Sequence, residues 1–167
     1  MATLMTERLE IISINSDFDS LKKDTLVTQL PDILTENVVE NLPPYFHDLT
    51  TKSAAKEWLN KMLSESQLYL VRSIQTGEAL GFLFTYEGCD GDVHIGFLLG
   101  EPHWQKGFAK ELLKAFIEFA LTQTSWKRLV GGVDSQNQAS AGLLTKLGFK
   151  KLAAQDSNVV FFEYILS

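Results

Sequence analysis

The chain has 167 residues, of which 45% are apolar and 22% are charged, and its formal net charge is −6. This composition is typical of an ordinary globular protein, and we expect residues 1–167 to form a single domain. The acidic balance argues against a nucleic-acid binder, and no apolar run reaches the roughly 20 residues of a membrane helix. Cys89 is the only cysteine, which excludes an internal disulfide and fits a reducing cytoplasm.

Charge is distributed unevenly along the chain. Between Trp104 and Lys151 there are eight Lys or Arg and three Asp or Glu, whereas residues 1–103 contain seven Lys or Arg and sixteen Asp or Glu. The basic part can attract an anionic ligand and the acidic part a cationic one. Chance clustering on solvated faces explains the same distribution equally well.

The first elements that we expect are a strand over residues 7–14 and two helices. Ser16 or Asp17 can cap the first helix. Pro31 fits the first turn of a second, short helix that runs to about Asn41, because proline is tolerated where no intrahelical N–H bond is needed.

The stretch 42–47 contains two prolines and cannot continue a helix. Thr50 or Thr51 can cap a third helix after it. The apolar residues that follow at helical spacing predict its buried face, made by Ala55, Trp58, Leu59 and Met62.

From Gln67 onward the hydrophobic period becomes that of strands. We expect strands over 67–74 and 80–86, joined by a hairpin turn, and a third strand of this meander over 92–99. His94, Gly96 and Leu98 lie on one face of the third strand. Its other face carries Val93, Ile95, Phe97 and Leu99.

The remaining pattern alternates helices and strands. It predicts a central helix over 108–121, a strand over 128–133, a helix over 138–147 that ends at Gly148, and strands over 149–153 and 159–166. The strand–helix–strand unit implies a right-handed crossover and a locally parallel pair. We therefore expect an α/β (α+β) fold: a mixed, mostly antiparallel twisted sheet of about seven strands, flanked by helices on both faces.

A glycine-containing turn joins the third meander strand to the central helix. Such a turn leaves backbone N–H groups unpaired at the helix start, where the helix dipole favours an anion, so we predict that it binds a diphosphate. It lacks the lysine and Ser or Thr of a Walker loop, and it lacks the Gly-x-Gly-x-x-Gly fingerprint. A glycine that serves turn geometry alone is the alternative. The residues concerned are Gln105, Lys106, Gly107, Phe108, Ala109 and Lys110.

This turn resembles the acetyl-CoA loop of the GNAT N-acetyltransferases, whose pattern is Arg/Gln-x-x-Gly-x-Gly/Ala. Trp104 stands at the first position and departs from that pattern. An aromatic residue there, followed by x-Lys-Gly-aromatic-Ala, looks like the ribosomal-protein N-acetyltransferase (RimJ/RimL-type) branch. Three more stretches resemble that branch in the same order: Thr-Glu-Arg-Leu at 6–9, His-Ile-Gly-Phe at 94–97, and Asn137-x-x-Ser140 followed by Leu-x-Lys-Leu-Gly-Phe at 144–149.

The resemblance implies the acyl-CoA N-acyltransferase fold and acetyl-CoA as cofactor, with its diphosphate on residues 105–110. It implies that the pantetheine arm lies along Phe97, Leu98 and Leu99 as an added pseudo-strand, which unpaired strand groups can support. Asn137 and Ser140 would line the cofactor's other side, and a serine at the second position would protonate the departing thiolate. Without the resemblance, Ser140 is an ordinary residue near a helix start.

Acetyl transfer to an amine requires that the amine lose a proton. Many members of the family use a glutamate on the third meander strand, where this chain has His94. A histidine titrates near neutrality, so we predict a catalytic role for His94 beside Ser140. The alternative is a half-buried histidine that only hydrogen-bonds within the sheet. Glu163 is the nearest acid in the last strands, and we expect it to face solvent.

The proline-rich loop contains Tyr45, Phe46 and His47, and this fold often folds such a loop over the acceptor. We therefore predict that the three bind substrate; a surface loop with its aromatic rings packed on the core is the alternative. No spacing suggests a metal site.

The expected activity is transfer of acetyl from acetyl-CoA to a protein N-terminal amine or a small cationic amine, by direct attack in a ternary complex. The alternative is a non-catalytic acyl-CoA-binding sensor or subunit. We expect no nucleic-acid or membrane partner, and a monomer or a homodimer.

Overall fold

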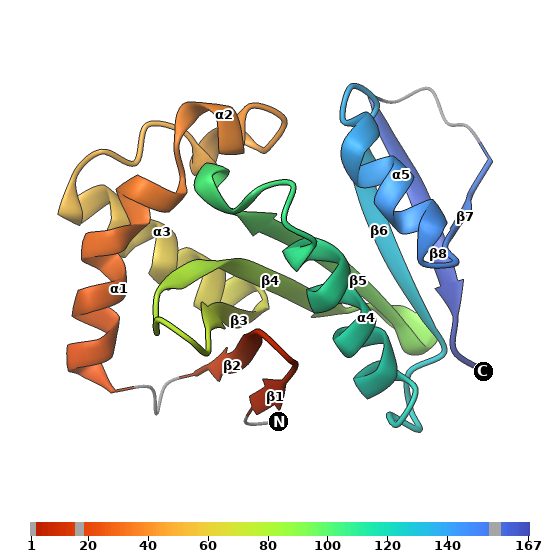
Figure 1. Ribbon diagram of the computed structural model, residues 1–167. Helices are drawn as coiled ribbons and strands as arrows, with labels where there is room; N and C mark the ends of the chain where they lie inside the picture. The colour runs from red at the N-terminus through yellow and green to blue at the C-terminus, as the bar shows by residue number, and fades with distance from the viewer. Residues whose placement is uncertain (1–2, 16–18, 154–157) are drawn as a thin grey trace.

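The computed structural model describes residues 3–15, 19–153 and 158–167 (Figure 1). In these residues eight strands form one sheet in the order β1-β2-β3-β4-β5-β6-β8-β7. All neighbouring strands are antiparallel except β5 and β6, which are parallel. The strands are β1 (Thr3–Met5), β2 (Leu9–Ile14), β3 (Gln67–Ser73), β4 (Ala79–Glu87), β5 (Asp92–Leu99), β6 (Arg128–Asp134), β7 (Lys150–Lys151) and β8 (Val159–Ile165).

Helices cover both faces of this sheet, so the expected mixed, mostly antiparallel architecture is confirmed. The meander β3-β4-β5 and the crossover from β5 through α4 to a parallel β6 are also present as predicted. The α-helices among the described residues are α1 (Ser20–Ile33), α2 (Glu36–Val39), α3 (Lys52–Glu65), α4 (Phe108–Ala120) and α5 (Gln138–Lys146).

Alternation along the strands divides the buried side chains between two cores. The core under α4 and α5 includes Leu83 and Phe116, and the core under α1, α2 and α3 includes Leu30 and Phe82; all four are 0% exposed. Each such side chain contributes roughly 1.5–3 kcal/mol of burial free energy. Together the two cores hold the strands at fixed positions on which a site can be built.

The start of the chain differs from expectation in two respects. Pro31 does not begin a second helix: α1 is one helix with Pro31 in its last turn, and α2 is a separate helix of four residues. Pro31 has no N–H to donate to the Val27 carbonyl, so one intrahelical bond is lost and α1 ends two residues later; Leu34 N still donates to Leu30 O at 2.8 Å. The short β1, paired with β2, is an additional strand.

The caps agree in part with the sequence. Ser16 and Asp17 lie outside the described residues, and Asp19 caps α1 by accepting from Leu21 N at 2.8 Å. Thr51 caps α3 as expected, accepting from Ala54 N. None of the helices in the described part of the chain is long and apolar enough to cross a membrane.

Candidate functional site: the diverging strands and the turn before α4

Strands β5 and β6 are paired over only part of their length. Their parallel register runs from the Asp92–Arg128 pair to the Ile95–Gly131 pair. Beyond it β5 stays with β4, β6 continues with β8, and the two diverge (Figure 1). A cavity of about 110 Å³ lies between them. Its lining includes Asn41, Leu42, Phe97, Asp134, Asn137 and Ser140.

The backbone of β5 alternates between its two neighbours. Gly100 N donates to Leu80 O on the β4 side, and Lys127 N donates to Gly91 O on the β6 side. Even-numbered residues therefore direct their N–H and C=O groups to β4, and odd-numbered residues direct theirs to β6. Past the last pair, Phe97 and Leu99 face the gap with their main chain, whereas Leu98, predicted as a cofactor contact, turns its main chain to β4.

Asn137 and Ser140 lie together at the start of α5. Asn137 is the N-cap residue, and its Oδ1 accepts from Ser140 N at 3.2 Å. This bond fixes the first turn of the helix beside the cavity. Both residues are half-buried and line the cavity, so the structure brings together the pair that the sequence singled out.

The turn before α4 has two residues in the left-handed region. Gln105 has φ of 61° and Gly107, the N-cap of α4, has φ of 81°. No side chain caps this helix. The N–H groups of the first helical turn have no intrahelical partner, and the helix dipole places positive partial charge there. The turn is exposed, and Lys106 and Lys110 add two cations to it.

Arg8 holds this turn from the N-terminal part of the chain, a role that the sequence did not reveal. Its Nη1 donates to Lys106 O at 2.9 Å, and its guanidinium lies 4.3 Å from the centroid of the Phe108 ring. Its Nε donates to Glu111 Oε1 at 2.7 Å. A β-carbon on Gly107 would come within 3.3 Å of Arg8 Nη2. The guanidinium thus lies at the predicted anion site, with the Glu111 carboxylate as its counter-ion.

Trp104 ties the other side of the turn to β5. Its indole Nε1 donates to Leu99 O at 2.8 Å, so the side chain connects the turn to the end of β5. Trp104 stands at the position that is Arg or Gln in the strict pattern. The neighbouring His103 contacts two other side chains. Its Nε2 lies 3.7 Å from Glu78 Oε1, and its ring packs edge-on to the Phe108 ring.

His94 is on β5 but outside the lining of the cavity. Its side chain is exposed, and its ring centroid lies 6.1 Å from that of Tyr86. The position that a β-carbon on Gly88 would take is 3.5 Å from the imidazole. The ring therefore lies toward the β4–β5 turn, away from Ser140, and its catalytic role stays a prediction. Asp134 is the titratable residue among the described residues that line the cavity.

The loop before α3 contributes to the cavity through residues other than Tyr45, Phe46 and His47, whose substrate-binding role stays a prediction. Asn41 and Leu42 line it. His47 Nε2 lies 2.9 Å from Leu42 O, and since a carbonyl oxygen can only accept, Nε2 carries the proton. Phe46 is buried against Trp58, with ring centroids 5.5 Å apart. Tyr45 is 44% exposed and lies on the surface, with Lys61 Nζ 4.9 Å from the centroid of its ring.

Glu163 does not face solvent as expected. Its Oε2 accepts from Arg128 Nη1, and Arg128 also forms a two-bond contact with Asp92 at 2.7 and 2.9 Å. Hydrogen bonds from Arg128 hold the pKa of Asp92 below its usual range. This trio joins β5, β6 and β8 and is structural. No group of three or more His, Cys, Asp or Glu among the described residues is arranged to hold a metal ion.

The sequence model of the acetyltransferase (GNAT) domain matches residues 12–150, which is most of the chain. The chain belongs to the GNAT acetyltransferase family.

Two relatives are similar over most of their length. The GNAT chain is 28% identical over 155 residues to the uncharacterized N-acetyltransferase p20 of Bacillus licheniformis, covering 90% of this chain and 84% of that protein. It is 29% identical over 136 residues to the L-methionine sulfoximine/L-methionine sulfone acetyltransferase of Pseudomonas paraeruginosa, covering 77% and 78%. The family match and these two relatives together identify the protein as a GNAT-family N-acetyltransferase.

A solved structure shares the fold. RimL, the ribosomal L7/L12 alpha-N-protein acetyltransferase in complex with coenzyme A, superposes with a TM-score of 0.77 over 98% of this chain and 97% of that one. The sequence identity is 17%, which shows a common fold and leaves the ribosomal-protein branch a prediction.

Proposed function

We propose that this GNAT protein transfers an acetyl group from acetyl-CoA to a primary amine that is positively charged in water. The observation that carries the proposal is the open edge of β5, which leads from the cavity to the turn at the start of α4. Trp104 connects the two by its bond to Leu99 O. The acceptor is a protein N-terminal amine or a small cationic amine, which reacts by direct attack in a ternary complex.

The residues present fit coenzyme A. The unpaired N–H groups of residues 105–110, with Lys106, Lys110 and Arg8, suit the diphosphate. The main-chain groups of Phe97, and the N–H of Leu99, suit the pantetheine amides. Solved neighbours of this fold include one with coenzyme A and one with acetyl-CoA and AMP, which supports the same use here.

Acetyl-CoA, when bound, supplies an activated thioester carbonyl. The chain's part is to orient and to move protons. Ser140 lies at the start of α5, where its backbone N–H donates to Asn137 Oδ1, and its hydroxyl would protonate the departing thiolate and regain a proton from solvent. The amine must lose a proton, and Asp134, His94 or a water molecule accepts it. Of the two side chains, only Asp134 lines the cavity.

The acceptor class follows from the same lining. Asp134 attracts an ammonium ion, and Asn41 and Leu42 bound the cavity from the loop that His47 holds. The resemblance to the RimJ/RimL branch favours a protein N-terminus. The relative that acetylates L-methionine sulfoximine favours a small amino-acid-like amine. An acyl-CoA-binding sensor is the second candidate, and the exposed position of His94 outside the cavity favours it.

The experiment is an acceptor screen that follows release of the coenzyme A thiol. Acetyl-CoA is incubated with peptides of varied N-terminal residue, L-methionine sulfoximine, polyamines and aminoglycosides. We expect release that depends on one class of acceptor and is lost without protein. Tight coenzyme A binding with no acceptor-dependent release would instead establish the sensor, and absence of coenzyme A binding would overturn both.

A further inference from the structure

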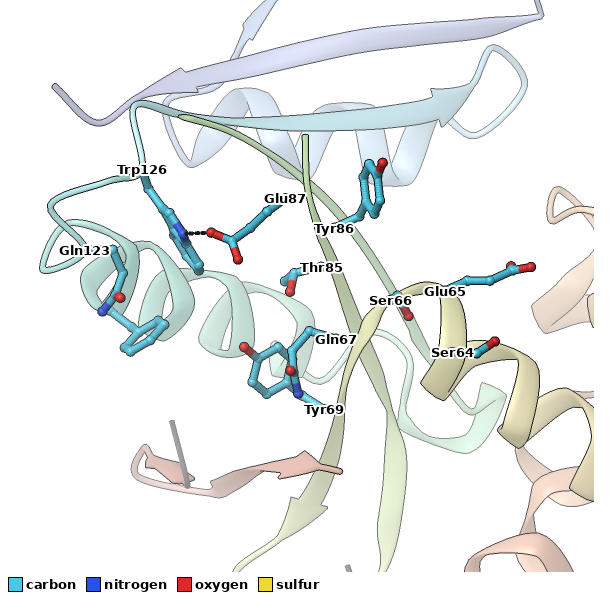
Figure 2. A pocket seen from close by; sticks show the side chains of 11 residues that line it. Ser64, Glu65, Ser66, Gln67, Tyr69, Thr85, Tyr86, Glu87, Gln123 and Trp126 are labelled. Atoms are coloured by element: carbon cyan, nitrogen blue, oxygen red, sulfur yellow. Dashed lines mark hydrogen bonds between the residues drawn. The ribbon is translucent and has the colours of Figure 1, made fainter. Parts of the chain in front are cut away.

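A second and larger hollow lies at the opposite end of β5 from the cavity, at the C-terminal end of α4. Its volume is about 380 Å³, and it shares no lining residue with the cavity between β5 and β6. The end of α3, strands β3 and β4, and the segment after α4 form it (Figure 2). We call it the Trp126 pocket.

The floor of the Trp126 pocket is polar where the same sheet face is otherwise apolar core. Tyr69 and Thr85 lie on the α4 side of β3 and β4, and each is only 4% exposed. Thr85 is the buried polar side chain among the described residues, and its hydroxyl pairs with that of Tyr69. Burial raises the pKa of Tyr69 although Thr85 hydrogen-bonds to it, so the phenol is neutral and can accept a hydrogen bond.

The charge on the wall of the Trp126 pocket is negative. Glu87 Oε1 accepts from Trp126 Nε1 at 2.7 Å, which orients the carboxylate beside the floor (Figure 2). Glu65 also lines the pocket, but Lys61 Nζ pairs with it at 2.8 Å, and Figure 2 shows its side chain apart from Glu87. None of the described lining residues is Lys or Arg. The C-terminal end of α4 adds negative partial charge.

Aromatic rings complete the pocket. Phe119 and Trp126 pack edge to face with centroids 5.8 Å apart, and the Tyr69 ring lies on the floor. Aromatic faces attract cations and also accept an apolar chain. Buried hydroxyls, one uncompensated carboxylate and these rings are the groups that recognise an alkylammonium ion.

We propose that the Trp126 pocket binds a small organic ammonium ion, with the ammonium group at Glu87 and the Tyr69 and Thr85 hydroxyls and a short alkyl chain against Trp126 and Phe119. This site is separate from acetyl transfer and does not depend on the proposed function. Because Glu87 is exposed, solvent screens its charge, and we expect a weak affinity, with a Kd of roughly 1 mM.

The indole N–H of Trp126 reports on this site directly, because it is bonded to Glu87. The experiment titrates the protein with n-butylammonium, n-butanol and butyrate and follows the tryptophan indole signals by ¹H–¹⁵N NMR. Trp126→Phe identifies the signal. We expect a saturable shift of that signal with n-butylammonium and no saturable shift with the neutral or anionic analogue. Equal responses to all three probes, or none, would overturn the proposal.

Two carboxylate variants locate the ammonium ion. Glu87→Gln is expected to weaken n-butylammonium binding by roughly tenfold, while the matched Glu65→Gln changes it by less than about twofold. Asp134→Asn tests the cavity between β5 and β6 and is expected to leave the binding unchanged. If Asp134→Asn removed the binding and Glu87→Gln did not, the ammonium would lie in the acceptor cavity and the Trp126 pocket would not be its site.

Discussion

Arg8 Nε and Glu111 Oε1 lie 2.7 Å apart, although 103 residues separate them in the chain. Thr6 Oγ1 and Arg8 N also donate to Glu111, so the segment before β2 is fastened to the first turn of α4 by three bonds. The same guanidinium binds Lys106 O. The turn with the predicted anion site is thereby fixed to the sheet at a second point besides Trp104.

Replacing Arg8 should weaken cofactor binding more than catalysis. Arg8→Gln removes both a positive charge and the bond to Lys106 O, and we expect coenzyme A affinity to fall by roughly tenfold, with kcat at saturation changed less. Arg8→Lys keeps the charge but cannot bond Glu111 and Lys106 O at the same time, so its coenzyme A affinity should lie between those of wild type and Arg8→Gln. Calorimetric titration with coenzyme A measures this. Arg72→Gln, which breaks the Arg72–Glu10 pair on β3 and β2, is the control. Equal affinities for wild type and Arg8→Gln would contradict the assignment.

The Glu111 carboxylate should make stability depend on pH. Burial alone would raise its pKa, but hydrogen bonds from Thr6 and Arg8 prevail and lower it below its usual value of 4.5. A lowered pKa in the folded state means that the contribution to stability is present above pH 4.5 and is lost as the pH falls through the folded value.

Glu111→Gln tests that contribution. The variant should have a lower urea midpoint than wild type at neutral pH, and the two midpoints should converge as the pH falls below 4.5 and through the lowered pKa of Glu111 in the folded state. Asp92 titrates in both proteins and cancels in the difference. A midpoint difference that is the same at neutral and acid pH would show that packing, and not charge, accounts for the effect.

Ser140→Ala should lower turnover and leave cofactor affinity nearly unchanged. Proton transfer from a positioned group contributes about 10²–10⁴-fold to rate, so a fall in kcat of about a hundredfold is expected with an acceptor found in the screen. Thr145→Ala, on the same helix with its hydroxyl bonded to Ala141 O, is the matched control. Loss of the proton donor should slow a poor leaving group more than a good one, so an acetyl thioester of a more acidic thiol should partly restore the Ser140→Ala rate. A kcat equal to that of wild type would remove Ser140 from the mechanism.

The proton acceptor can be identified by comparing Asp134→Asn with His94→Ala. Because Asp134 lines the cavity and His94 does not, we expect the first variant to lose more turnover than the second. If His94 does act, through water, His94→Ala should lower turnover more than cofactor affinity and remove a group from the pH profile. An unchanged rate and profile for both variants would indicate that the amine arrives already neutral.

Much of the framework could be predicted because it depends on local pattern. The change of period at Gln67 marks the meander, and Gly107 marks the turn before α4. Pairs that depend on tertiary packing had no local signal. Arg8 reads as an ordinary strand residue until α4 packs beside it, and Glu163 reads as solvent-facing until Arg128 approaches from β6.

The lining of the cavity, too, could be predicted only in part from the sequence. Asn137 and Ser140 were singled out by the resemblance of the stretch 137–149 to the GNAT family, and both line the cavity. Asn41 and Leu42 were missed because nothing in the loop indicates which of its residues reaches the diverging strands. The neighbouring aromatic residue Phe46 has the stronger hydrophobic signal, and it belongs to the core.

The alternating backbone of β5 has a consequence for amide hydrogen exchange. Gly96 and Leu98 are bonded to β4, whereas Phe97 and Leu99 present their N–H groups to the gap past the last β5–β6 pair. Protection along this strand should therefore alternate residue by residue in the free protein, within a strand that is otherwise interior. A bound molecule that hydrogen-bonds to the open edge would slow exchange at Phe97 and Leu99 and remove the alternation. The exchange rates of these two amides would therefore show whether a ligand pairs with β5 at each position.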